Sequence, residues 1–232
     1  MNSRKIIPAL DTTELESVAR LAAAVGSHPA IHGFKVGFGL GLTFGLPKTV
    51  EVIRRYSQKP IIYDHQKAGT DIPDTGSLFA RTLKGAGIDE AILFPEAGPE
   101  TLRAWVEALA DVDMTTIVGG VMTHPAYLES EGGFIVDRAA AEIYRLARAL
   151  GVSRFVMPLT KPELARSLWR AAELDDRSVL YSPGYGAQSG DLARFAWVKT
   201  HYVIIGRTLL AAPDPAAYVD RVARALEANH EE

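Results

Sequence analysis

Short runs of apolar, β-prone residues alternate along this chain with longer stretches in which apolar residues recur every three or four positions. The first pattern is typical of buried strands, and the second is typical of helices that pack by one face. Eight stretches follow the strand pattern: residues 5–10, 33–37, 60–64, 90–94, 115–122, 154–157, 178–181 and 201–205. Seven stretches follow the helix pattern: residues 13–22, 47–56, 77–84, 99–110, 137–150, 161–172 and 215–228.

Residues at the ends of several predicted helices support these boundaries. Thr13 and Glu16 have the spacing of a capping box, which satisfies backbone N–H groups at a helix start. Pro47 suits the first turn of a helix, and Gly151 suits the position just after a helix. The glycine-rich stretch 37–45 is expected to be a loop.

Eight strands alternating with helices over 232 residues give about 29 residues per unit, as a (β/α)₈ TIM barrel requires. A doubly wound open sheet is the alternative. That fold would normally have fewer strands and a glycine fingerprint for phosphate after the first strand, where this chain has Asp11-Thr12-Thr13. No linker or change of composition divides the chain, so we predict a single domain over residues 1–232.

Composition narrows the possible functions. A net charge of −3 without a basic stripe argues against nucleic-acid binding. The absence of cysteine excludes disulfides, thiolate nucleophiles and cysteine-ligated zinc. The first apolar run is too short for a signal peptide, and no run is long enough to span a membrane. We therefore predict a cytoplasmic protein without a membrane or nucleic-acid partner.

Candidate chemistry follows from position, because the catalytic side chains of a TIM barrel lie where its strands lead into loops. The residues at these junctions are Asp11, Lys35, Asp64, Lys67, Asp71, Thr123, His124, Pro183 to Gln188, Gly206 and Arg207. Three carboxylates and one lysine fall within residues 64–74 alone. A charge run is usually a solvated loop, and the position of this one at the end of a strand favours a chemical role.

The loops after the seventh and eighth strands form the usual phosphate site of a TIM barrel. Glycine amides in residues 182–190 and the paired donors of Arg207 would suit a phosphate, although glycine-rich loops beside surface arginines are common. For His124 we prefer a local hydrogen-bonding role. The six histidines lack metal-site spacing, so no metal site is predicted. The tryptophans are expected to be packing residues: Trp105, Trp169 and Trp197.

In these junction residues the chain resembles the orotidine 5′-phosphate decarboxylase family over nearly its whole length. The matching pieces are Ala9-Leu10-Asp11, Phe34-Lys35-Val36-Gly37, Asp64 with Lys67 and Asp71 to Thr75, Thr123-His124-Pro125, Ser182 to Gln188, and Ile204 to Arg207. The resemblance implies a TIM barrel that decarboxylates orotidine 5′-phosphate to UMP in pyrimidine biosynthesis. It also implies no metal or organic cofactor, a pyrimidine nucleotide as substrate, and a homodimer with shared active sites.

The resemblance further implies catalytic roles. Asp64, Lys67, Lys35 and the partner subunit's Asp71 would form a network of alternating charges, in which Lys67 protonates the pyrimidine carbon that loses carbon dioxide. Asp11 and Lys35 would hold the ribose hydroxyls. The remaining substrate-binding residues would be Ile72 and Thr75 toward the partner's site, Thr123 at the pyrimidine, Pro183 in the loop after the seventh strand, and Gln188, Gly206 and Arg207 at the phosphate.

The spacing around Lys67 departs from the family's usual Asp-x-Lys-x-x-Asp. Here Asp64 is followed by Lys67 and Asp71, with one extra residue in each gap. Residues three apart on a strand face opposite sides, so Lys67 can join Asp64 only if the strand bulges or ends at Asp64. Gly69 could absorb the second insertion, because glycine tolerates unusual backbone angles.

Two alternatives follow from the same residues. Magnesium-dependent enzymes of the hexulose-phosphate synthase and ketogulonate-phosphate decarboxylase group use the same barrel, but they carry an acidic residue after the second strand, where this chain has Lys35. A non-catalytic paralogue that binds a pyrimidine nucleotide is the other alternative. The altered spacing is its support, and the presence of every charged residue argues against it.

Overall fold

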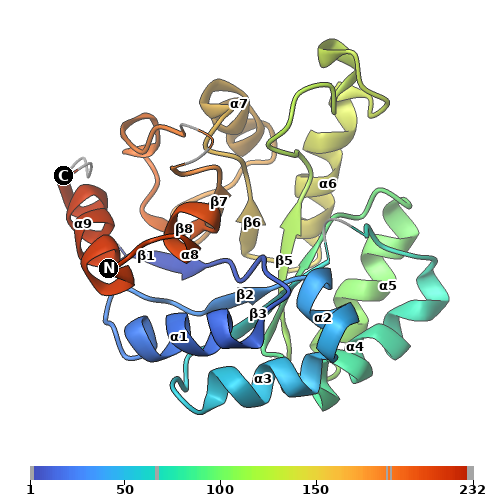
Figure 1. Cartoon of the computed structure of the whole chain (residues 1–232). Coiled ribbons are helices and arrows are strands. Elements are labelled where there is room, and N and C mark those ends of the chain that lie inside the picture. Colours follow the sequence, from blue (N-terminus) through green and yellow to red (C-terminus); the bar gives the residue numbers. More distant parts are fainter. Residues whose placement is uncertain (1–2, 66–67, 187, 189, 229–232) are drawn as a thin grey trace.

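Parallel strands form the centre of the fold, and helices surround them (Figure 1). The computed structural model describes residues 3–65, 68–186, 188 and 190–228. These residues form one eight-stranded sheet with the neighbour order β1-β8-β7-β6-β5-β4-β3-β2. The strands are β1 (Ser3–Pro8), β2 (Phe34–Val36), β3 (Ile61–Asp64), β4 (Glu90–Leu93), β5 (Thr115–Gly119), β6 (Arg154–Val156), β7 (Val179–Pro183) and β8 (Thr200–Ile205).

Backbone contacts between β1 and the segment leading through β2 close the sheet. Ile6 is bridged to Ile31 and Ala9 to Lys35, both in parallel orientation. The amide of Leu10 donates to the carbonyl oxygen of Lys35 at 2.8 Å. The predicted (β/α)₈ TIM barrel is therefore confirmed.

Helices follow the strands around the outside of the barrel. None in the described part of the chain is long and apolar enough to cross a membrane. The α-helices are α1 (Leu15–Val25), α2 (Phe38–Phe44), α3 (Leu46–Arg54), α4 (Gly76–Gly85), α5 (Pro99–Ala110), α6 (Asp137–Ala149), α7 (Pro162–Ala171), α8 (Arg207–Leu210) and α9 (Pro215–Ala228), and the short 3₁₀ turns are η1 (Pro73–Thr75), η2 (Glu129–Glu131) and η3 (Ala193–Phe195).

The prediction that the glycine-rich stretch 37–45 forms a loop is wrong, because most of this stretch forms the helix α2. Its apolar residues alternate with glycines, and Leu40 is buried against the core. Each interior glycine disfavours a helix by about 1 kcal/mol relative to alanine, so packing outweighs propensity here. The helix ends at Gly45, whose φ of 78° lies in the region that favours glycine.

Two boundaries also differ from the prediction. The helix α1 begins at Leu15 rather than at a capping box on Thr13, since Glu14 is its N-cap residue and makes no side-chain capping bond. The strand β5 ends at Gly119, because the next amide, that of Gly120, donates to the Tyr144 hydroxyl at 3.0 Å.

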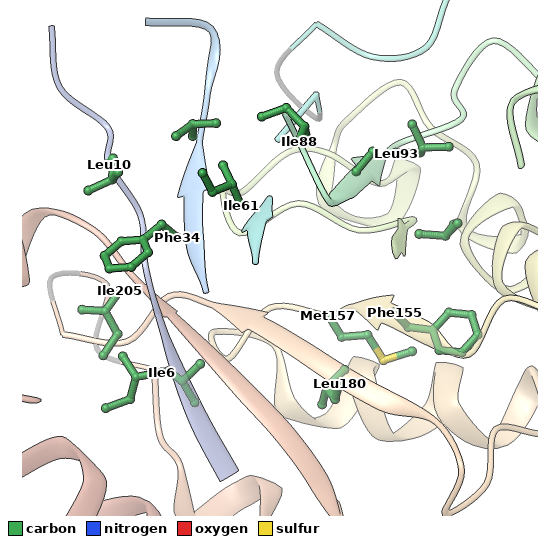
Figure 2. Close-up of a cluster of buried hydrophobic side chains, with 14 of the residues drawn as sticks. Ile6, Leu10, Phe34, Ile61, Ile88, Leu93, Phe155, Met157, Leu180 and Ile205 are labelled. Atoms are coloured by element: carbon green, nitrogen blue, oxygen red, sulfur yellow. The ribbon is translucent and has the colours of Figure 1, made fainter. Parts of the chain in front are cut away.

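Apolar side chains fill both faces of the barrel wall. Alternate strand residues point to opposite faces. Ile6 and Leu180 belong to the outer cluster, which also contains helix residues and which Figure 2 shows in part, while Ile7 and Tyr181 belong to the cluster inside the barrel. The interior is tight: a Cβ on Gly119 would lie 2.2 Å from the Phe94 ring. The filled interior confines any substrate to the ends of the strands.

Candidate active site

Loops at the carboxyl ends of the strands enclose a cavity of about 210 Å³. The strand ends of β1 and β2 contribute to it, and so do the loops after β5, β7 and β8. This is the barrel face at which TIM-barrel chemistry takes place. The lining residues are Ala9, Asp11, Lys35, Thr123, Pro183, Gly184, Tyr185, Gln188, Ile204, Gly206 and Arg207.

A buried ion-paired lysine lies at the base of this cavity. Lys35 is 3% exposed, and its Nζ donates to Asp64 Oδ2 at 2.6 Å and to Asp11 Oδ1 at 3.1 Å. Burial opposes the charge on the ammonium, but the two carboxylates outweigh burial and raise the pKa of Lys35 above its ordinary value. Lys35 is therefore a fixed cation at neutral pH.

The register of three neighbouring strands explains this arrangement. Lys35 pairs with Ala9 on one side and with Ile62 on the other. Asp11 and Asp64 each lie two residues beyond these partners, and residues two apart on a strand share a face. Both carboxylates therefore stand one level above the Lys35 backbone, and the long lysine side chain reaches up between them.

The strand that carries Asp64 ends at that residue. The amide of the next residue, His65, still donates to the carbonyl oxygen of Ile92 at 3.2 Å. The imidazole ring of His65 packs against Phe79. The end of β3 meets one of the two conditions under which Lys67 could reach Asp64. Lys67 itself lies outside the described residues.

Three predicted site residues lie beyond this strand and apart from the cavity lining that the described residues form. Asp71 is exposed, Ile72 is 56% exposed, and Thr75 is half-buried at the end of η1. None of the three is among the described residues that line the cavity. This placement is compatible with their predicted role toward a partner's site, which stays a prediction.

The residues predicted to bind the phosphate, Gln188, Gly206 and Arg207, all line this cavity. Gln188 Nε2 donates to Thr123 Oγ1 at 3.4 Å, so the loops after β5 and β7 meet at the cavity. A Cβ on Gly206 would lie 3.5 Å from Asp11 Oδ2, which brings the loop after β8 beside the charged cluster. Arg207 is exposed at the rim. The cavity thus has a charged base and a rim of hydrogen-bond donors.

Other lining residues belong to stretches that the sequence analysis named, but no individual role was predicted for them. Tyr185 lies in the predicted loop, and burial raises the pKa of its hydroxyl. Ala9 and Ile204 are small or apolar strand residues that carry no polar signal. His124 packs edge-on against Tyr127 and does not line the cavity. Among the described residues, no group of three or more histidine, aspartate or glutamate side chains is placed to hold a metal ion.

Comparisons with known proteins agree with this geometry. Residues 4–222 match the Orotidine 5′-phosphate decarboxylase / HUMPS family. Orotidine 5′-phosphate decarboxylase of Methanosarcina mazei is 30% identical over 224 residues, which cover 96% of this chain and 95% of that protein. The enzyme of the same name from Pyrococcus horikoshii is 30% identical over 213 residues, which cover 90% and 93%. The structure of orotidine 5′-monophosphate decarboxylase from Methanocaldococcus jannaschii complexed with inhibitor BMP matches with a TM-score of 0.82 at 25% identity, covering 97% of this chain and 99% of that one.

Proposed function

The chain belongs to the orotidine 5′-phosphate decarboxylase / HUMPS family, and we propose that it decarboxylates orotidine 5′-phosphate to UMP without a cofactor. The observation that carries this proposal is the ammonium of Lys35, buried between Asp11 and Asp64. A magnesium enzyme of the hexulose-phosphate synthase group would need an acidic residue after β2. Here a fixed cation already pairs with both neighbouring carboxylates, which favours the decarboxylase.

The reaction breaks the bond between the pyrimidine ring and its carboxylate. Carbon dioxide leaves, and the electron pair stays on the ring carbon, where no electron sink is available. The ammonium of Lys67, aimed at this carbon, would stabilise the developing carbanion and then donate the proton that gives UMP. Asp64 and Asp71 would keep Lys67 protonated, because nearby opposite charges favour the charged form.

The rest of the cavity would hold the nucleotide. Asp11 and Lys35 would bind the ribose hydroxyls from the base of the cavity. Gln188, the Gly206 amide and Arg207 would bind the phosphate at the rim. The contact between Gln188 and Thr123 joins the phosphate side of the cavity to the pyrimidine side. Binding of the phosphate by Gln188 would therefore help to position the residues around the pyrimidine.

Shared active sites in a homodimer form the second part of the proposal. Asp71, Ile72 and Thr75 are absent from the cavity lining that the described residues of their own chain form, and a second copy could use them. Large apolar side chains are exposed in the same region, namely Ile72 itself and Leu78 on the following helix. Burying such side chains would stabilise a subunit contact. From the sequence we also propose that the protein is a single domain and that it is cytoplasmic.

Turnover assays separate the candidate functions. The purified protein should convert orotidine 5′-phosphate to UMP, followed by ultraviolet absorbance, at a rate that a metal chelator does not change. Chelator-sensitive turnover of a hexulose phosphate would favour the magnesium enzyme. Binding of UMP in calorimetry without any turnover would favour the non-catalytic paralogue.

A further inference from the structure

Four aromatic rings gather where the chain leaves β3. His65 stacks at a tilt on Phe79, with ring centroids 4.7 Å apart, and Phe79 lies 4.5 Å from Trp105. His65 is also 5.8 Å from Trp105 and 5.5 Å from Tyr63, whose hydroxyl lies 3.4 Å from the His65 Nδ1. We call Tyr63, His65, Phe79 and Trp105 the aromatic cluster. It fixes the first residue after the strand.

Trp105 also holds the far end of the same segment. Its Nε1–H donates to the carbonyl oxygen of Ile72 at 3.0 Å, and the same oxygen accepts a bond from Thr75 Oγ1 at 2.8 Å. Trp105 is 2% exposed, so its indole has little freedom to follow a moving loop. A Cβ on Gly76 would lie only 2.9 Å from Trp105 Cδ1, which shows how closely the start of α4 packs on this ring.

One side chain of α5 thus contacts both ends of the segment between residues 65 and 72. Along the sequence, that segment carries Lys67 and ends beside Asp71. We infer that Trp105 is a positioning residue for the decarboxylation. By contacting His65 and Ile72, it fixes the distance between the two ends of the segment that carries Lys67 and Asp71, and the directions in which the chain leaves them. This inference rests on the proposed function, and it assigns Trp105 no contact with the substrate.

The position of Trp105 predicts which kinetic constant it governs. The residues proposed for the ribose and phosphate lie at the ends of β1 and β2 and in the loops after β7 and β8, and none of them belongs to the aromatic cluster. Loosening residues 65–72 should therefore leave nucleotide binding nearly unchanged. It should slow the chemical step, because small displacements of a catalytic group can cost about a hundredfold in rate.

The test compares two matched substitutions. Trp105→Phe keeps an aromatic ring in the cluster but removes the N–H that donates to the Ile72 carbonyl oxygen, together with part of the buried ring volume. Trp197→Phe makes the same replacement at a half-buried tryptophan outside the cluster, whose Nε1 donates to the Arg194 carbonyl oxygen at 2.9 Å. Each variant is assayed for kcat, for UMP affinity, for melting temperature and for amide hydrogen exchange of peptides covering residues 63–76.

We expect Trp105→Phe to lower kcat by about ten- to a hundredfold with unchanged UMP affinity, and to speed exchange in residues 63–76. Trp197→Phe should do neither, even if its melting temperature falls as far. An unchanged kcat in active Trp105→Phe protein would overturn the inference, and so would equal rate losses in both variants. If the wild-type protein has no activity, the proposed function fails. Unchanged hydrogen exchange of residues 63–76 in Trp105→Phe would show separately that Trp105 does not fix this segment.

Discussion

Acid should destabilise this protein through His201, a buried histidine on β8. Its ring is fully buried, its Nε2 lies 2.8 Å from Ser182 Oγ, and its Nδ1 has no hydrogen-bond partner among the described residues. Burial and the nearby charge of Arg4 lower the pKa of His201 to about 3. A second proton would place an unsatisfied positive charge inside the protein.

The magnitude follows from linkage. The unfolded chain takes up the proton near the ordinary histidine pKa of about 6.5, whereas the folded chain resists it down to about 3. The unfolded state therefore binds more protons between these values, and stability falls as the pH falls. The loss from His201 is about 2 kcal/mol at pH 5 and approaches about 5 kcal/mol below pH 3.

Urea unfolding at pH 7 and pH 5 measures this loss, at one protein concentration so that any association stays constant. His201→Gln is the control, because glutamine can still bond Ser182 and does not titrate. Burial also lowers the pKa of His65, which has the same sign, but both proteins contain His65 and the difference between them cancels it. The wild-type protein should lose about 2 kcal/mol more than His201→Gln between the two pH values. Equal losses would refute a neutral buried His201.

Four further outcomes test the site. Lys67→Ala should abolish turnover while UMP still binds in calorimetry; substantial remaining activity would move the proton transfer to another side chain. Mixing Lys67→Ala chains with inactive Asp71→Ala chains should restore activity, because hybrid dimers contain one intact site; no recovery despite confirmed subunit exchange would count against shared sites. Arg207→Ala should weaken UMP binding by about 2 kcal/mol and uridine binding far less; equal losses for the two ligands would show that Arg207 does not bind the phosphate. Lys35→Ala should lower the free energy of unfolding by about 3–5 kcal/mol, because it leaves Asp64 buried without this cation; in urea unfolding, a loss below 1 kcal/mol would contradict the pairing.

The charged cluster could be predicted from the sequence because its positions depend only on strand order. Once the strands before Asp11, Lys35 and Asp64 are located, their carboxyl ends must meet at one face of the barrel. The sequence did not predict that Lys35 bonds both carboxylates, because that depends on the register of three strands. Register is a property of pairs of strands, and no single strand contains it.

Other features depend on contacts that leave no local signal. The helix α2 forms against its glycine content because Leu40 finds a place in the core. The sequence predicts that Trp105 is a packing residue, and its burial agrees with this prediction. The sequence does not show that its N–H donates to a carbonyl oxygen 33 positions earlier in the chain. The spacing around Lys67 likewise leaves its geometry open, since a loop's path depends on what anchors its ends.

The closure of the barrel also bears on how the protein is made. Along β1 and β8 the register pairs Ser3 with Thr200, a separation of 200 − 3 = 197 residues. During synthesis β1 is made before the other seven strands, and β8 is made last. Contacts of such long separation also form slowly, because a large chain loop must be closed first. β1 therefore gains its β8 neighbour only after all the other strands have been made, whereas its contacts with Lys35 and the segment around it involve residues that lie close in sequence and can form much earlier.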